Sequence, residues 1–344
     1  MAPEISTTDT VFLVRHGERI DHVSQLWQND PAHGISDPPL TSLGHQQAEM
    51  TGQRLGELIQ QQQQQRKTMT TAAPIILVYT SPFQRCIDTS IGIIKGLGGC
   101  IDSQYPPLLR MDLGLTEWMS DQFYDEIYCS GSQFLARHQE QLARRQAMHY
   151  HQLHLQHHDS PPSPPPTSDD NDDDNDSSKK SISQPFILPP LTIDYTYHSS
   201  QYTDFSFPES YPDMLKRFDY TRQQCIVQSS FSFLPKKYQR CSSSSIYVIM
   251  VTHGIGINAL LDSFRNTTTR PIKTPYCCIS RFQYKRLFSA SSIGGNKFLS
   301  FAKSDNDDGD DDDDDDGWLD PTSLKFEQWK WVPDLLASDS HLTL

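Results

Sequence analysis

Two histidines and two arginines have the chemistry needed to handle a phosphate ester. An imidazole nitrogen, such as that of His16 or His253, is a nucleophile that can attack phosphorus and carry the phosphoryl group. The guanidinium groups of Arg15 and Arg85 each present a planar fork of donors that matches phosphoryl oxygens. If the fold brings these side chains together, they form a phosphate site that contains its own nucleophile.

Short apolar segments precede these residues and have the composition of buried strands. Val11–Arg15, Pro74–Tyr79 and Ile246–Thr252 are rich in β-branched and aliphatic residues, and a helical pattern follows each of them. This alternation predicts a three-layer α/β sandwich, in which a mostly parallel sheet carries helices on both faces. Ligands bind beyond the carboxyl ends of such strands, so the two histidines and two arginines should converge at one edge of the sheet.

The remaining elements are expected from caps and periodicity. Helices are predicted at Ser42 to about Gln60, from Ser81-Pro82 onward, at Tyr211–Gln228 and from Ile255 to about Phe264, and two late strands at Ile279–Leu287 and Lys297–Ala302. With the Ser81 hydroxyl as its cap and Pro82 in its first turn, the second helix would add its positive end to the phosphate site.

Four short motifs carry the reactive residues and spread from Val11 to Gly254. They are Leu13-Val14-Arg15-His16-Gly17-Glu18, Leu40-Thr41-Ser42-Leu43-Gly44-His45-Gln46-Gln47-Ala48, Ser81-Pro82-Phe83-Gln84-Arg85-Cys86 and Val251-Thr252-His253-Gly254. Together they resemble the histidine phosphatase superfamily, in the branch that contains phosphoglycerate mutase. Arg19, Asp21 and Asp37-Pro38-Pro39-Leu40 make the chain most similar to the subgroup of suppressor-of-T-cell-receptor-signalling-like phosphatases and related fungal proteins.

The resemblance implies a phosphoglycerate mutase-like fold and a role for each matching residue. His16 would be the nucleophile that forms phosphohistidine, at a solvent-facing strand end. The phosphate would be held by Arg15, Arg19, Arg85 and His253. No metal or other cofactor would be required, because the arginines supply the positive charge.

The leaving oxygen needs a proton, and a carboxylic acid must supply it. Glu117, in Gly114-Leu115-Thr116-Glu117-Trp118, matches the position of the proton donor in the family. Glu18 and Asp21 are nearby carboxylates and remain as alternatives.

Charge and composition divide the chain. The formal net charge is -14, but Asp169–Asp176 and Asp305–Asp316 hold sixteen aspartates between them, so the rest is close to neutral. We expect one histidine phosphatase-like domain over residues 1–303 with a low-complexity insert at about 149–183, an acidic disordered linker at 304–317 and a Trp-containing tail at 318–344. The cluster His149, His151, His154, His157 and His158 favours a solvated linker over a metal site.

Several classes of protein are excluded by what the sequence lacks. It has no block of Lys and Arg for nucleic acid, and no apolar run near the ~18 residues of a membrane span. Its seven cysteines form no CxxC pair and its start has no basic segment, which favours the cytoplasm, with the nucleus as the alternative. No cysteine has an arginine six positions later, which excludes a cysteine-based tyrosine phosphatase.

The sequence therefore predicts a phosphomonoester hydrolase whose substrate is a phosphorylated small molecule or phosphoprotein. A phosphoglycerate mutase-type phosphotransferase is the first alternative, although Arg19-Ile20-Asp21 replaces the stretch found there in mutases. The second is an interaction or scaffold subunit that binds a protein partner through the acidic runs or the C-terminal tail. A homodimer is compatible with either class.

Overall fold

The computed structural model describes residues 8–65, 73–98, 105–158, 191–198, 201–239, 244–287 and 328–342. Its strands are β1 (Thr8–Arg15), β2 (Ile75–Thr80), β3 (Leu108–Met111), β4 (Thr192–Ile193), β5 (Ile246–Thr252), β6 (Ile279–Leu287) and β7 (Gln328–Ser338). Its α-helices are α1 (Ser42–Gln65), α2 (Gln84–Leu97), α3 (Gly131–His158), α4 (Tyr211–Val227), α5 (Lys236–Gln239) and α6 (Gly254–Arg265).

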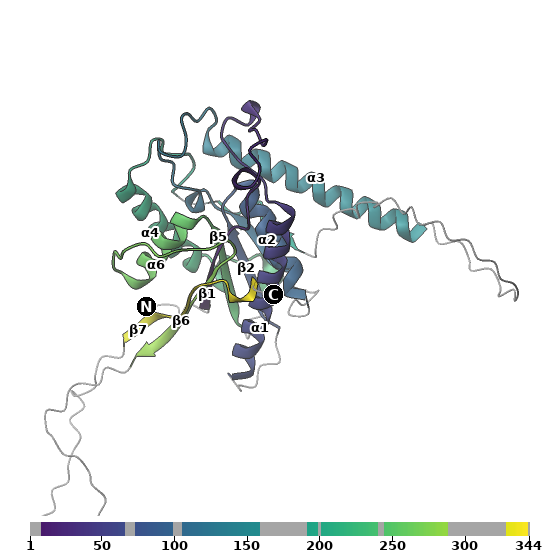
Figure 1. Cartoon of the computed structure of the whole chain (residues 1–344). Helices are drawn as coiled ribbons and strands as arrows, with labels where there is room; N and C mark the ends of the chain where they lie inside the picture. Colours follow the sequence, from purple (N-terminus) through teal and green to yellow (C-terminus); the bar gives the residue numbers. More distant parts are fainter. Residues whose placement is uncertain are drawn as a thin grey trace, which may run out of the picture.

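All seven strands form one sheet, in the order β4-β3-β2-β5-β1-β6-β7. The first five strands are mutually parallel, whereas β6 runs antiparallel to β1, and β7 antiparallel to β6. Figure 1 shows α1 and α2 on one side of the sheet and α4 and α6 on the other. The predicted α/β sandwich with a mostly parallel sheet is thus confirmed.

The alternation of side chains along the buried strands explains the two helical layers. In β1, Phe12 and Val14 belong to the core shared with α1 and α2. Val11 and Leu13 point to the opposite core, which includes residues of α4 and α6. Both faces of this strand are therefore apolar, as expected for a central strand of a parallel sheet.

Most predicted elements are present, with shifted ends. The Gln run extends α1 to Gln65, and Thr41 caps this helix by accepting a hydrogen bond from the Gly44 N–H at 2.9 Å. The predicted cap of α2 is different: the Gln84 N–H donates to the distant Asp37 carboxylate at 3.0 Å, whereas the Ser81 hydroxyl accepts a longer bond, of 3.4 Å, from the Phe83 N–H.

The predicted C-terminal tail is partly a strand of the sheet. Residues 328–338 form β7, and Trp331 packs edge-to-face against Phe264 of α6 with ring centroids 5.3 Å apart. The assignment of residues 1–303 to one domain remains a prediction. Because β7 belongs to the same sheet, part of the predicted tail packs with the other strands. The predicted strand Lys297–Ala302 and both acidic runs lie outside the described residues.

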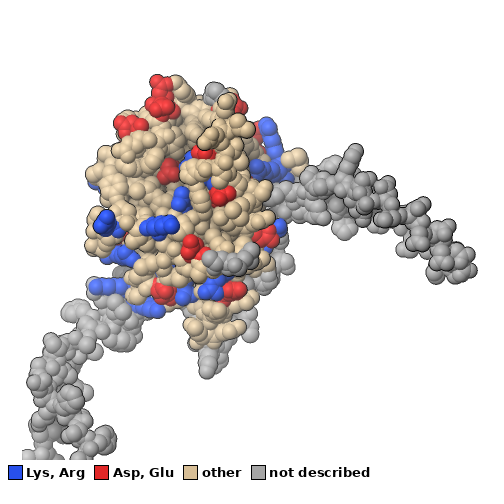
Figure 2. All heavy atoms as spheres, in the orientation of Figure 1, with Lys and Arg blue, Asp and Glu red and all other residues tan. Residues whose placement is uncertain are grey.

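The long helix α3 was not predicted. Its backbone continues through the His149–His158 cluster, whose side chains lie outside the described ones. Within the parts of the chain that the structure describes, no helix is both long enough and apolar enough to cross a membrane. On the face shown in Figure 2, Lys and Arg are interspersed with Asp and Glu.

Candidate active site

Adjacent strands bring the reactive residues together. Arg15 is the last residue of β1 and pairs with Thr252, the last residue of β5. The His16 N–H donates to the Thr252 carbonyl at 3.0 Å, so His16 and His253 leave the sheet side by side. Their ring centroids are 5.4 Å apart. Arg85 reaches the same place from the first turn of α2.

His16 is held in one tautomer and is kept neutral. Its Nδ1 lies 2.8 Å from the Gly17 carbonyl oxygen, which can only accept, so Nδ1 carries the proton and Nε2 has a lone pair. Burial, followed by the charges of Arg85 and Arg15, holds the pKa of His16 well below 6.5. The expectation of a solvent-facing side chain was wrong: it is 1% exposed, because the rings of His253 and Tyr276 flank it.

His253 also has a defined tautomer. Arg85 Nη2, which carries only donors, lies 3.1 Å from His253 Nδ1, so this nitrogen accepts. The proton is then on Nε2, which donates to Ser81 Oγ at 2.9 Å. Burial and the charge of Arg85 lower the pKa of His253 well below its ordinary value. Ser81, predicted as a helix cap, instead orients this ring.

Arg85 is buried, with 1% of its surface exposed, and lies between two carboxylates. Its Nη1 is 3.6 Å from Asp37 Oδ1, and its Nη2 is 3.5 Å from Glu117 Oε2. Among the residues that the structure describes, Arg85 Nε and Nη1 and Arg15 Nε are buried donors without a hydrogen-bond acceptor. Buried polar groups are rarely left unpaired, so these N–H groups are available to an anion.

Of the three candidate carboxylates, Glu117 faces the histidines. Its Oε2 lies 3.3 Å from His253 Nδ1, and 14% of the side chain is exposed. Glu18 accepts a hydrogen bond from Thr41 at 2.8 Å, and Asp21 forms a bidentate pair with Arg19. Only the position of Glu117 combines contact with the buried site and access to solvent.

The other two arginines line the entrance. Arg15 donates to the Thr274 carbonyl at 2.6 Å, and its guanidinium lies 4.4 Å from the centroid of the Tyr276 ring. Tyr276 in turn hydrogen-bonds to His22. Arg19, although paired with Asp21, borders the same cavity.

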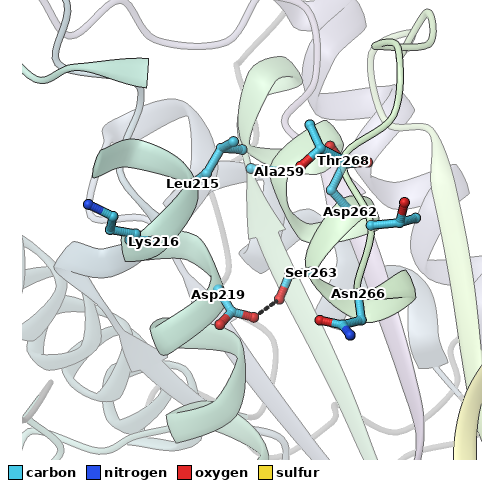
Figure 3. Close-up of a pocket in the computed structure, with 9 residues that line it drawn as sticks. Leu215, Lys216, Asp219, Ala259, Asp262, Ser263, Asn266 and Thr268 are labelled. Atoms are coloured by element: carbon cyan, nitrogen blue, oxygen red, sulfur yellow. Dashed lines mark hydrogen bonds between the residues drawn. The ribbon is translucent and has the colours of Figure 1, made fainter. Parts of the chain in front are cut away.

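A cavity of about 330 Å³ borders this site, although the buried residues His16, Arg85 and His253 are not among its lining residues. Its lining residues are Arg15, Arg19, His22, Ser36, Glu117, Phe123, Tyr124, Gly254 and Ile255. A second cavity, of about 440 Å³, lies between α4 and α6 and contains none of the predicted site residues. In Figure 3 Asp219 of α4 accepts a hydrogen bond from Ser263 of α6 beside it. The predicted site residues Arg15, Arg19 and Glu117 line the smaller cavity instead.

The first two motifs meet through a pair of glycines. A Cβ on Gly17 would lie 2.5 Å from the Gly44 carbonyl oxygen, and a Cβ on Gly44 would lie 2.4 Å from the Glu18 carbonyl oxygen. These distances are too short for any side chain. The two motifs thus need glycine so that the start of α1 can pack against the turn after His16.

Sequence reasoning missed two residues behind the site. Asp37 was noted only as part of a motif, but it caps α2 and contacts Arg85. His138 of α3 is buried beside it, with Nε2 3.1 Å from Asp37 Oδ2. Buried residues of α3 recur every four positions at Phe134, His138 and Leu142, a spacing that could have identified this helix.

Comparison with known proteins points to one family. The sequence model of the histidine phosphatase superfamily (branch 1) matches residues 11–146. An ecdysteroid-phosphate phosphatase of Drosophila melanogaster is 27% identical over 135 residues, which cover 32% of this chain and 16% of that relative. The chain therefore spans much less than two thirds of that protein.

Two solved structures illustrate the similarity in three dimensions. The ecdysone phosphate phosphatase of Bombix mori, in complex with tungstate, has a TM-score of 0.44 and 16% identity, and the match covers 87% of this chain and 98% of that one. A phosphoserine phosphatase variant of Entamoeba histolytica, in complex with phosphoserine, has a TM-score of 0.37 and 14% identity over 80% and 91%. The match to the superfamily model thus covers the part of the chain that carries Arg15, His16, Arg85 and Glu117.

Proposed function

We propose that this chain hydrolyses phosphate monoesters through a phosphohistidine intermediate on His16. The observation that carries the proposal is a neutral imidazole beside buried guanidinium N–H groups that have no acceptor. A phosphoryl group would accept hydrogen bonds from Arg15 and Arg85 while the His16 Nε2 lone pair faces phosphorus. Preorganised donors of this kind stabilise the charge that develops in the transition state.

The reaction would take two steps. First, His16 Nε2 forms a bond to phosphorus, the ester P–O bond breaks, and the Glu117 carboxyl gives its proton to the leaving oxygen. Next, water attacks phosphorus, the P–N bond breaks, and Glu117 takes the proton from the water. Arg85 would hold a phosphoryl oxygen, and His253 would join it with a proton on Nδ1, the nitrogen that accepts from Arg85 before substrate binds. Arg19 would bind at the entrance. The guanidinium groups supply the positive charge, so no metal is needed.

The side chains that line the cavity favour a substrate whose alcohol group is apolar. Phe123, Tyr124 and Ile255 line the 330 Å³ cavity together with Arg15 and Arg19. The Drosophila relative is named for a phosphate ester of a steroid. We infer that this chain also acts on a phosphorylated small molecule with an apolar or aromatic alcohol, because such a group would be desolvated against these side chains.

Within the superfamily, we assign the chain to the subgroup of suppressor-of-T-cell-receptor-signalling-like phosphatases. The assignment is supported by Arg19 and Asp21, which pair with each other, and by Asp37, which contacts Arg85. A mutase would transfer the phosphoryl group to a second organic acceptor rather than to water. A scaffold subunit would bind without turnover.

The test is phosphate release from a panel of esters, combined with a search for the intermediate. His16→Ala should abolish turnover, and mass spectrometry of a rapidly quenched wild-type reaction should find phosphate on His16. His45→Ala, which removes an exposed histidine of α1, is the matched control and should retain activity. Phosphate on a serine or cysteine, or equal turnover by the His16 variant, would overturn the mechanism. Transfer to phosphoglycerate without release would identify a mutase, and inactivity on every ester a scaffold.

A further inference from the structure

We propose that Arg217 and Glu209 are positioning residues that fix the loop carrying Glu117. The inference rests on the proposed function, in which Glu117 transfers the proton. Neither residue lines the cavity of the site, and neither touches the histidines. Their effect on the reaction would pass through the backbone of residues 114–119.

Arg217 donates hydrogen bonds to three backbone carbonyls of this loop. It lies on α4 and is 5% exposed. Its Nη1 donates to the carbonyls of Gly114 and Thr116 at 2.9 and 3.1 Å. Its Nη2 donates to the carbonyl of Glu117 itself at 3.2 Å. One guanidinium therefore satisfies the carbonyls on both sides of the turn and at the reactive residue.

Glu209 completes the arrangement from the other side. Its carboxylate accepts both Nε and Nη2 of Arg217 at 2.7 Å, which fixes the guanidinium plane. Its backbone carbonyl accepts from the Trp118 indole N–H at 2.9 Å, and its backbone N–H donates to the Met119 carbonyl at 2.7 Å. The residues on both sides of Glu117 are thus tied to the same buried ion pair.

Such a support has a specific consequence for proton transfer. The loop has no regular helix or strand at Glu117, so its backbone position depends on these hydrogen bonds. A displacement of about 1 Å at a reacting group can reduce a rate about a hundredfold. Leu215, Lys216 and Asp219, which neighbour Arg217 on α4, line the second cavity instead (Figure 3).

The experiment compares two substrates and a double-mutant cycle. Phenyl-type esters with good leaving groups, such as p-nitrophenyl phosphate, hardly need a proton donor, whereas alkyl phosphates do. Arg217→Lys should lower kcat about tenfold or more on an alkyl phosphate and less than about threefold on p-nitrophenyl phosphate, because it misplaces the acid without removing it. In a Glu117→Gln background, the same substitution should have no further effect on kcat for the alkyl ester.

Matched controls separate positioning from general damage. Arg110 and Asp194 form a second buried pair, 2.9 Å apart, and Arg110 donates to the carbonyls of Gln228 and Phe233. Arg110→Lys should lower the melting temperature without changing the ratio of the two substrates. Glu209→Gln retains the shape of Glu209 and gives the same test wherever an Arg217 variant does not fold.

The outcomes distinguish this inference from the proposed function. If Glu117→Gln alone slows both substrates equally, Glu117 is not the acid and the proposed function fails at that residue. If Glu117→Gln is selective but the Arg217 and Glu209 variants slow both substrates equally, or add their full loss in the Glu117→Gln background, the positioning role is overturned. Selective losses that vanish in that background support it.

Discussion

Substituting Arg85 should separate the charge of its guanidinium from its shape. Arg85→Lys retains a positive charge but loses the planar fork, whereas Arg85→Met loses both. Removing one oxyanion donor slows an enzyme about 10²–10³-fold, and Arg85 presents two nitrogens, Nε and Nη1, whose N–H groups have no hydrogen-bond acceptor. We expect losses in kcat/KM of about 10²-fold for Arg85→Lys and about 10³-fold or more for Arg85→Met.

The pH profile adds a second measurement to the same pair of variants. Arg85 is, after burial, the largest cause of the lowered pKa of His16. The acid limb of kcat/KM reports the loss of neutral His16, so it should lie well below pH 6.5 in the wild type. Arg85→Met should move this limb to higher pH, although not above 6.5, because burial remains. Arg85→Lys should leave it in place.

The stability of these variants must be measured alongside. Arg85→Met removes the guanidinium partner of buried Asp37 and of the partly exposed Glu117, and breaking a buried ion pair destabilises a folded protein by about 3–5 kcal/mol. For a chain of this size that loss lowers the melting temperature by ~10 °C, so assays belong well below the transition. An unchanged acid limb in Arg85→Met, or an equal shift in Arg85→Lys, would refute the electrostatic reasoning.

Three further predictions concern the fold and the chemistry. Thermal stability should fall as the pH drops below 6.5, because burial lowers the pKa of His16 and His253, so the unfolded chain binds more protons than the folded one. In His16→Gln, the melting temperature should depend less on pH over this range. Trp331→Ala should destabilise the protein by about 2 kcal/mol in urea titrations, because Trp331 is partly buried where it packs on Phe264. An unchanged urea midpoint would mean that the stability of the fold does not depend on this contact of β7. Phosphate release should survive excess EDTA, and loss of activity restored by zinc or magnesium would contradict the arginine-based mechanism.

The central strands and the reactive residues could be predicted because their signals are local. Each strand is a short apolar run, and His16 and His253 follow such runs directly. The direction of the strands then determines that both histidines reach the same edge. No information from distant residues was needed for this part of the site.

The supporting residues could not be predicted, because their partners are far away in the sequence. Ser81 has the position of a helix cap, but its hydroxyl is bound by His253 while Asp37 caps α2 instead. Arg217 reads as a polar position of an amphipathic helix, and its role depends on a loop about a hundred residues earlier. Such contacts are determined by tertiary packing and leave no local pattern.

The last strand escaped prediction for a related reason. Residues 328–338 contain a proline and an aspartate and lack regular alternation, which weakens any strand signal. What makes them a strand is β6, with which β7 pairs from Leu287↔Gln328 to Ile279↔Ser338. An edge strand with one neighbour tolerates proline, so composition alone could not decide.

The position of β1 in the sheet has a consequence for synthesis of the protein on the ribosome. This strand emerges before the other described strands of its sheet, and its neighbours β5 and β6 are both encoded late in the sequence. The apolar strand β1 therefore has no hydrogen-bonding partner strand until β5 and β6 have been synthesised. Prolonged exposure of an unpaired apolar strand favours association with chaperones or with other nascent chains. Truncated products that stop before β5 would carry His16 but no completed sheet around it, and they should be insoluble rather than partly active.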